Sequence, residues 1–541
     1  MGTLWYGGPI YTLQEDGHKV EAIFTEGEKI IDLGTLKDLE QRYSVKINNR
    51  FDLAGNAMLP GFVDSHLHLI NHGIKLIRLD LSTYHSKVEV LEAVKRYSEQ
   101  MEPGEWIIGE GWNDNLWESP APILRKDIDE AVPNHPVILK RICRHAMVVN
   151  SLALREASIE EGMDSPQDGV IEKDENGKLN GVFKENAQDL ITNAVPKATD
   201  EYLKKALRTA INDAHQQGLT GVHTEDLAYH NGFQHTYNLF KEVIETEGYR
   251  IRAHLLVNHE VMNDFKNFDG SFLKGSQWVE FGAIKIFTDG SLGGRTALLS
   301  YPYADDPSTN GVAIFSQEEL NHLVAKVREL NMPVAVHAIG DLAFEMVLEA
   351  IEMHPIRDAG RDRLIHAQIL RKDLIQRAKK LPLVLDIQPP FVASDFPWVI
   401  ERVGEEHLDS CYAWKTLISE NIPCAGGSDA PIEKISPLLG IHAAITRTNP
   451  NEEEPVVYGS EEVLSVYEAV SLYTKGSAMA ACHELDRGIL KEGYLADFTI
   501  LDQDIFQCKQ EELLNVKVDM TVVGGEIVYS KQNAVNLTEQ L

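Results

Sequence analysis

Short apolar runs recur along this chain, and segments with helical periodicity separate them. A short run of apolar, often β-branched residues is typical of a strand in a parallel sheet that helices cover on both faces. Eight such runs predict strands near residues 58–64, 219–224, 250–257, 281–287, 333–337, 362–366, 383–388 and 423–428. Capping boxes over 316–319 and 465–468 predict two helix starts. We therefore expect an α/β fold.

Both ends of the chain differ from its middle. Residues 1 to about 56 and the segment after 496 have the pattern of short strands with turns, and Gly524-Gly525 between two apolar runs predicts a hairpin. The gap between the first two of the eight strands is too long for one crossover. We therefore expect an insertion over about residues 75–200, in a loop position suited to substrate selection.

Residues that bind metals end several of the apolar runs. His66 and His68 follow the first run, and side chains at i and i+2 of a strand point to the same side. Further candidates are Lys285, inside the fourth run, and His337, His366 and Asp429, which end later runs. Each histidine alone is compatible with a hydrogen-bonded residue at a strand end, but the joint pattern predicts a metal site at the C-terminal face of a (β/α)8 barrel.

Six phrases, in order along the chain, carry a resemblance to the amidohydrolase superfamily of metal-dependent hydrolases. They are LPGFVDSHLHL at 59–69, GEGWNDNLW at 109–117, KIFTDGSLGGRTA at 285–297, VHAIGDLA at 336–343, IHAQ at 365–368 and GGSDAPI at 426–432. The chain resembles most the amidohydrolase-3 branch, which includes YtcJ-like proteins and N-substituted formamide deformylase. The resemblance implies a TIM-type barrel domain over 57–484 and a small β-sandwich domain in which 1–56 and 485–541 join.

The resemblance implies roles for the candidate ligands. His66 and His68 would bind a first metal ion, and His337 and His366 a second. Neutral imidazole suits zinc, iron or manganese. We expect one or two divalent ions, with zinc as the first choice and iron or manganese as alternatives.

Lys285 and Asp429 need separate arguments. Burial and nearby cations depress a lysine pKa, and the neutral amine can then add carbon dioxide. The resemblance implies such a carbamate on Lys285, bridging two ions; the alternative is a lysine paired with Asp289 or Asp429 beside one ion. The resemblance makes Asp429 a metal ligand that also takes the proton from the bound water. The alternative is a carboxylate that caps a helix.

Other positions are weaker candidates. His145 lies in a phrase similar to the family's GHxxxxN, with Arg144 where glycine is usual, and would polarise a substrate carbonyl, although a structural role is equally open. Phe391 stands where the family often has a histidine, so the substrates of relatives do not transfer directly. We further expect Asp289 to orient Lys285 or its loop, and Trp112 and Trp117 either to line the pocket or to pack in a core.

The composition restricts the partners. The chain has 541 residues and a net charge of −32, from 51 basic and 83 acidic residues, which disfavours nucleic acid and anionic membranes. No run approaches the length of a membrane span, and because residues 1–6 lack a basic region followed by an apolar one, we do not expect them to act as a secretory signal. Five scattered cysteines without a Cys-x-x-Cys motif are typical of a reducing, cytoplasmic setting with buried thiols. Dimers are the commonest assembly, so a homodimer is the base-rate expectation.

These observations lead to a functional hypothesis. We expect a hydrolase that cleaves a non-peptide carbon–nitrogen bond of a small molecule, of amide or N-substituted formamide type, by metal-activated water. The same metal site would also serve cyclic amide opening, deamination, or ester or phosphoester hydrolysis. A third hypothesis is a non-catalytic regulatory protein, but such descendants usually lose ligands, and all six candidates are present here.

Overall fold

The computed structural model describes residues 1–117, 121–143, 145–166, 168–357, 360–452 and 455–532. The chain divides into two compact units. The first contains Met1–His72 and Leu207–Leu541, and the second is Gly73–Ala206.

Eight parallel strands of the first unit form a nearly closed barrel sheet, and they pair in the order in which they occur along the chain. The strands are β6 (Phe62–Leu67), β13 (Leu219–Thr224), β14 (Arg252–Asn258), β15 (Val279–Phe287), β16 (Val334–Ala338), β17 (Asp362–His366), β18 (Leu383–Ile387) and β19 (Cys424–Gly426). The predicted α/β barrel fold is confirmed. All residues of β13, β14, β17 and β18 are buried, which explains their continuous apolar signal.

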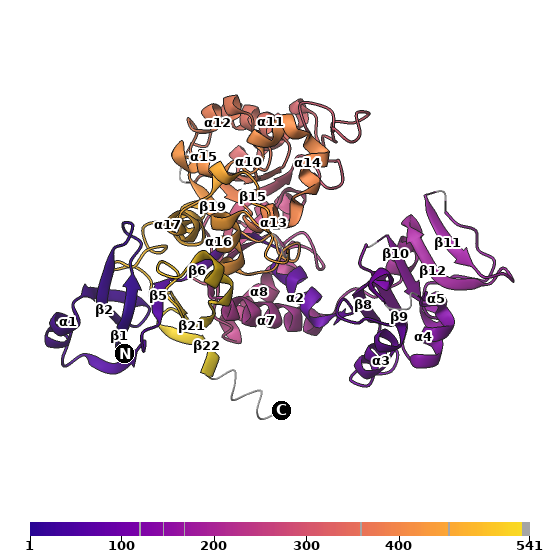
Figure 1. Cartoon of the computed structure of the whole chain (residues 1–541), viewed down its shortest axis with the longest axis horizontal. Coiled ribbons are helices and arrows are strands. Elements are labelled where there is room, and N and C mark those ends of the chain that lie inside the picture. Colours follow the sequence, from indigo (N-terminus) through magenta and orange to yellow (C-terminus); the bar gives the residue numbers. More distant parts are fainter. Residues whose placement is uncertain (118–120, 144, 167, 358–359, 453–454, 533–541) are drawn as a thin grey trace. The chain divides into compact units, whose positions relative to one another are not determined.

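Helices follow the barrel strands and lie outside the sheet (Figure 1). They are α2 (Leu69–Ile77), α7 (Asp200–Gln216), α8 (Phe233–Lys241), α9 (Met262–Asn267), α10 (Gln317–Glu329), α11 (Asp341–Met353), α12 (Lys372–Ala378), α13 (Pro390–Asp395), α14 (Trp398–Val403), α15 (Trp414–Ser419), α16 (Pro437–Thr446), α17 (Val466–Ser471) and α18 (Ser477–Ala480). Both predicted capping boxes are confirmed, with Ser316 and Glu319 opening α10 and Ser465 and Glu468 opening α17.

The first predicted strand, 58–64, is in fact the end of one strand and the start of another. β5 (Ala57–Pro60) pairs with β20 (Phe498–Leu501), outside the barrel, and the barrel strand β6 starts only at Phe62. The break falls at Gly61, where an added Cβ would lie 2.3 Å from the Thr220 side chain. Only glycine allows this close approach between the neighbouring chains.

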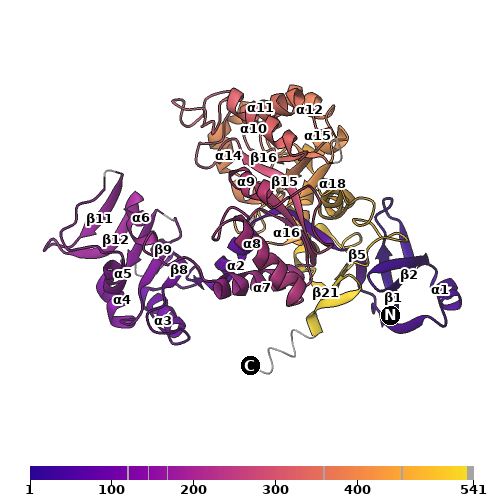
Figure 2. The ribbon, with the colours of Figure 1, turned by 180° about the vertical axis from the view of Figure 1, so that it is seen from behind.

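Strands from both ends of the chain form a second eight-stranded sheet. Its order is β22-β21-β20-β5-β1-β2-β3, with β4 beside β1, and β5 lies between β1 and the C-terminal strands (Figure 2). The remaining strands are β1 (Gly2–Tyr11), β2 (Lys19–Glu26), β3 (Lys29–Gly34), β4 (Ile47–Asp52), β21 (Val518–Val523) and β22 (Glu526–Ser530), and α1 (Leu36–Arg42) packs against β2. The predicted Gly524-Gly525 hairpin is confirmed between β21 and β22. The predicted domain boundaries stay a prediction.

The second unit has its own sheet, in the order β11-β12-β10-β9-β8-β7. Its elements are β7 (Leu79–Asp80), α3 (Lys87–Ser98), β8 (Ile107–Trp112), α4 (Arg125–Ala131), β9 (Val137–Arg141), β10 (Ala146–Val149), α5 (Ser151–Glu156), β11 (Gly169–Lys173), β12 (Leu179–Glu185) and α6 (Asp189–Thr192). Trp112 and Trp117 are buried in one apolar cluster of this unit, with ring centroids 5.9 Å apart. Core packing therefore accounts for both tryptophans.

Two predictions concern the whole chain. In the described part of the chain, no helix is both long enough and apolar enough to cross a membrane. All five cysteines are free thiols. Cys411 and Cys424 are buried as predicted, but Cys143 is exposed because it lies in the turn between β9 and β10.

Candidate metal centre

Three of the predicted ligands meet at the C-terminal ends of the barrel strands. One ligand atom each from His66, His68 and Asp429 lies within 4.8 Å of the other two. His66 Nε2 and His68 Nε2 are both 3.5 Å from Asp429 Oδ1. Two imidazoles and a carboxylate are a donor set that suits a divalent metal ion.

Main-chain hydrogen bonds where β19 meets β6 position these three residues. Asp429 N donates to His66 O at 2.7 Å, and His68 N donates to Ala430 O at 2.8 Å. Asp429 has a φ of +57°, in the left-handed region that side chains other than glycine rarely adopt. These hydrogen bonds between the segments that follow β19 and β6 therefore hold Asp429 in a strained conformation beside the two histidines, as is common at functional sites.

Lys285 on β15 lies in the same cluster. Its side chain is fully buried, and Nζ is 3.1 Å from His66 Nε2. Burial lowers the pKa of Lys285 to about 8, although the carboxylates of Glu225 and Asp429 act in the opposite direction. A substantial part of this amine is therefore neutral near pH 8, and a neutral amine is the form that reacts with carbon dioxide.

The other two predicted histidines lie on the next strands of the barrel. His337 on β16 and His366 at the end of β17 have ring centroids 4.5 Å apart, and the His366 ring is 5.7 Å from that of His66. His366 has a φ of +80°, a second strained residue at this face. The structure thus brings together the six predicted metal ligands.

The hydrogen bonds of three imidazoles determine which ring nitrogen carries a proton. The contacts are His68 Nδ1 to Glu225 O at 2.8 Å, His337 Nε2 to Gly290 O at 3.0 Å and His366 Nδ1 to Gln388 Oε1 at 2.8 Å. A carbonyl oxygen only accepts, so the nitrogen that faces it must donate. The opposite nitrogen of each ring is then available to a metal, an arrangement common among metal-binding histidines.

The charge states in the cluster also suit a metal. Burial holds the pKa of His66 and of His366 well below the usual range, so both rings are neutral and keep a lone pair. Burial acts to raise the pKa of Asp429, but the hydrogen bond with His68 and the positive charges of His68 and Lys285 outweigh it and keep the carboxylate ionised. The Asp429 and Glu225 carboxylates raise the pKa of His68 to about 9 against the effect of burial, so a metal would replace a proton on this ring.

The weaker candidates have different surroundings. Asp289 accepts hydrogen bonds from Leu298 N, Ile339 N and Gly340 N, and so holds the loops that follow β15 and β16. The Phe391 ring stacks on His366, with centroids 6.2 Å apart and planes 13° apart.

His145 belongs to the second unit. It is exposed, and its Nδ1 lies at hydrogen-bond distance, 3.0 Å, from Glu185 Oε2 on the surface, so its predicted catalytic role stays a prediction. Arg144 lies outside the described residues.

Glu225 is a residue that the sequence analysis missed. It directly follows β13, is fully buried, and accepts a hydrogen bond from Asn258 Nδ2 at 3.1 Å. The available signal was weak: Glu225 directly follows the predicted strand, but His223 and Thr224 before it are polar, so no apolar run leads up to it.

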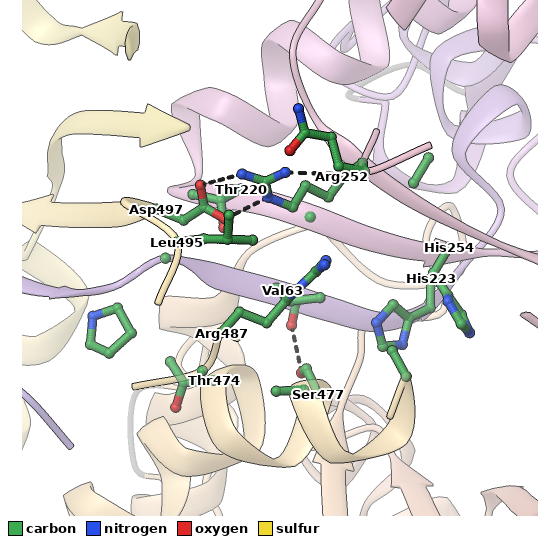
Figure 3. A pocket seen from close by; sticks show the side chains of 18 of the residues that line it. Val63, Thr220, His223, Arg252, His254, Thr474, Ser477, Arg487, Leu495 and Asp497 are labelled. Carbon is green, nitrogen blue, oxygen red and sulfur yellow. Dashed lines mark hydrogen bonds and ion pairs between the residues drawn. The ribbon is translucent and has the colours of Figure 1, made fainter. Parts of the chain in front are cut away.

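A pocket opens at the other end of the barrel strands, away from the predicted ligands. It is lined by the first residues of β6, β13, β14 and β15 and by the segment that follows α17 (Figure 3). Arg252 and Asp497 form a bidentate ion pair there, and Ser477 Oγ donates to Val63 O at 3.0 Å. His223 and His254 lie side by side, with ring centroids 4.9 Å apart.

The fold and the cluster together are those of a barrel hydrolase. Comparison with known families identifies the family to which the chain belongs. The model of the amidohydrolase family matches residues 50–529, so the chain belongs to the amidohydrolase family, and this membership implies hydrolase activity.

Individual relatives agree with this assignment. The chain is 49% identical to YtcJ of Bacillus subtilis (strain 168), whose name places it among the amidohydrolases, over 98% of this chain and all of that protein. It is 25% identical to N-substituted formamide deformylase of Arthrobacter pascens, over 94% of this chain and 95% of the enzyme. A crystal structure of an uncharacterized metal-dependent hydrolase from Pyrococcus furiosus has a TM-score of 0.80 and 30% identity, and covers 94% of this chain and 100% of its own.

Proposed function

We propose that this protein is a metal-dependent hydrolase that cleaves a non-peptide carbon–nitrogen bond of a small molecule, of amide or N-substituted formamide type. The observation that carries the proposal is the convergence of five ligand-type residues in one cluster, in which His66, Lys285 and His366 are buried and His68 and Asp429 are partly exposed. The names of the two amidohydrolase relatives support the type of bond.

The donor atoms of the cluster fit one or two divalent ions, with zinc as the first choice. His66, His68 and Asp429 would hold a first ion, and His337 and His366 a second. Lys285 would bridge the two ions as a carbamate, because its amine is buried and partly neutral. When bound, a divalent ion lowers the pKa of water in its coordination sphere and polarises a substrate carbonyl.

The protein's own residues supply the proton transfer. Asp429 is ionised and lies within 3.5 Å of both His66 and His68, so it can accept a proton from the attacking water. The same carboxyl then delivers the proton to the leaving nitrogen. Phe391 presents an apolar face beside His366, which favours a substrate with an apolar substituent near the reacting bond.

The test measures substrate range with zinc-loaded protein. N-alkyl and N-aryl formamides and simple amides are incubated with the wild type, and the released amine and carboxylate are quantified. We expect the two products in equal amounts, because hydrolysis of one amide bond yields one of each. Parallel reactions contain cyclic amides, amino-substituted heterocycles, carboxylic esters and phosphoesters. Turnover confined to one of these other classes would contradict the proposed bond, and metal-loaded protein without any turnover would favour a regulatory role.

A further inference from the structure

Glu225 is a buried carboxylate to which the proposed function gives no role. Its exposed fraction is 0%, and an ionised carboxylate in a protein interior is costly unless partners compensate it. Asn258 Nδ2 donates to Oε1 at 3.1 Å, whereas no donor among the described residues meets Oε2 with good hydrogen-bond geometry, although the Tyr229 hydroxyl lies near the Glu225 carboxylate. A buried oxygen of this kind calls for a specific explanation.

Glu225 faces His68 with both its main chain and its side chain. Its amide donates to the oxygen of Leu67, the residue before His68, at 3.1 Å. Its carbonyl oxygen lies 2.8 Å from His68 Nδ1, and its Oε2 lies 3.4 Å from the same nitrogen. The carboxylate is therefore on the opposite side of the imidazole from Nε2, the nitrogen that faces Asp429 at 3.5 Å.

We propose that Glu225 is a positioning residue that acts through His68 and determines how tightly the metal is held. The inference rests on the proposed function, because it requires a metal on His68. The carbonyl and the carboxylate of Glu225 together keep the proton on Nδ1, so Nε2 keeps the lone pair that binds the ion. A carboxylate behind a metal-binding imidazole also makes the ring a stronger ligand, and loss of such a partner typically weakens metal binding about 10–100-fold.

The charge distribution of the cluster supports this role. A divalent ion held by His68 would add positive charge to the cluster, where the His66 side chain is already fully desolvated. The buried Glu225 carboxylate, on the Nδ1 side of His68, offsets this charge together with Asp429 on the Nε2 side.

Direct ligation of the metal by Glu225 is the competing explanation. Within the described residues, the group of close ligand atoms contains His66, His68 and Asp429 but not Glu225. The position of Oε2 next to Nδ1 of His68 also places it behind the ring rather than beside Nε2. The geometry therefore favours action through His68.

The first experiment measures zinc affinity by competition with a chromophoric chelator. Glu225→Gln keeps the shape and the main-chain carbonyl but removes the charge. We expect the variant to bind the same number of zinc ions per chain with about 10–100-fold lower affinity. The matched control is Asp226→Asn, since Asp226 is equally buried and acidic but accepts from Thr224 Oγ1 at 2.6 Å rather than from a candidate ligand. Its zinc affinity should change less than about threefold.

The second experiment determines the tautomer of His68 directly, by NMR of protein labelled with ¹⁵N-histidine. The His68 signals are assigned as those that are absent from the spectrum of His68→Asn. We expect zinc-loaded wild type to carry the proton on Nδ1. A proton on Nε2 would overturn the inference even if Glu225→Gln failed to fold, because this measurement needs no Glu225 variant.

The outcomes separate this inference from the proposed function. Wild type that binds none of zinc, iron and manganese would refute the metal site itself. Wild type that binds zinc, together with an unchanged affinity in folded Glu225→Gln, would overturn only the role of Glu225. Loss of a whole zinc equivalent in that variant would also overturn it, because Glu225 would then be a direct ligand.

Discussion

Asp429 combines an ionised carboxylate with a backbone held at a φ of +57°, and both features depend on its position just after β19. Main-chain hydrogen bonds between the segments that follow β19 and β6 align the carboxylate with the two imidazoles. A proton acceptor fixed in this way needs little reorganisation during the reaction.

Replacement of Asp429 by asparagine tests this role. We expect Asp429→Asn to keep bound metal but to lose about 10²–10⁴-fold in kcat, because the amide cannot accept a proton. Turnover and metal content are measured on the same sample. Asp362→Asn is the control, since Asp362 is a buried acid at the start of β17 that pairs with Arg328, and its variant should lose stability but keep kcat. A wild-type rate in Asp429→Asn would refute the assignment.

Lys285 decides whether the centre holds one ion or two. If a carbamate on Lys285 bridges two ions, metal per chain should be near two after purification without chelators and with bicarbonate. It should fall to one or below in Lys285→Met, because the thioether side chain cannot form the bridge. The ratio is measured by elemental analysis with and without bicarbonate. A wild-type ratio near one that does not respond to bicarbonate would make Lys285 a charged partner of a single ion.

At the scale of elements, a buried ion pair joins β14 of the barrel to the residue before β20, in the sheet formed by both ends of the chain. Arg252 donates to Asp497 from Nε at 2.6 Å and from Nη2 at 3.0 Å, and Gly524 N donates to the same carboxylate at 2.7 Å. The Trp278 ring lies 4.6 Å from the Arg252 guanidinium carbon. Removal of one partner from a buried ion pair with this many hydrogen bonds strongly destabilises the folded protein, because the other charge stays buried without compensation.

We therefore expect Asp497→Asn to lower the free energy of unfolding by about 3 kcal/mol, because it leaves the Arg252 charge buried and without a counter-charge. Denaturant unfolding followed by tryptophan fluorescence measures the loss. Asp502→Asn is the control, since its pair with Lys531 is solvent-exposed and should contribute less than about 1 kcal/mol. Equal losses in the two variants would contradict a structural role for the buried pair.

A second element-scale feature depends on pH. Glu280 of β15 accepts from His254 Nδ1 at 2.9 Å and from His483 Nε2 at 2.9 Å. Burial acts to raise the pKa of Glu280, but the two histidines outweigh it and lower this pKa to about 2. Burial opposes the positive charge on His483, yet its hydrogen bonds with Asp486 and Glu280 raise the pKa of this imidazole.

The stabilisation by this network should be largest between about pH 4.5 and pH 6.5. Because the pKa of Glu280 is lowered in the folded state, this carboxylate contributes its full stabilisation at pH values above its pKa in the unfolded chain. The stabilisation is lost as pH falls towards 2. Because the pKa of His483 is raised in the folded state, this imidazole contributes its full stabilisation at pH values below its pKa in the unfolded chain. The stabilisation is lost as pH rises through its pKa in the folded protein. We expect Glu280→Gln to cost about 2–4 kcal/mol near pH 5.5 and less at pH 9, as measured by denaturant unfolding. In a His483→Gln background the decrease at high pH should disappear, and a cost that grows with pH would refute this account.

At the scale of the whole molecule, apolar patterning predicted the barrel because its strands are buried on both faces and leave a continuous signal. Candidate ligands were found for the same reason, since His337 and His366 interrupt that signal at the strand ends. Glu225 was missed because the predicted strand stopped at Thr224, and a single sequence does not show that the next residue is buried. The break at Gly61 was missed because β5 pairs with β20 and Gly61 lies close to Thr220, and both partners are distant in sequence.

The net charge of −32 is also a property of the whole molecule, and it predicts how stability responds to salt. Excess like charge repels itself in the compact state. Raising monovalent salt from 0.01 to 0.15 M shortens the Debye length from about 30 Å to about 8 Å, which screens most of this repulsion but leaves buried pairs such as Arg252–Asp497 nearly unaffected. We therefore expect Tm to rise over this range of sodium chloride, as followed by circular dichroism at constant pH and protein concentration. A fall in Tm would mean that exposed ion pairs contribute more to stability than the net repulsion removes.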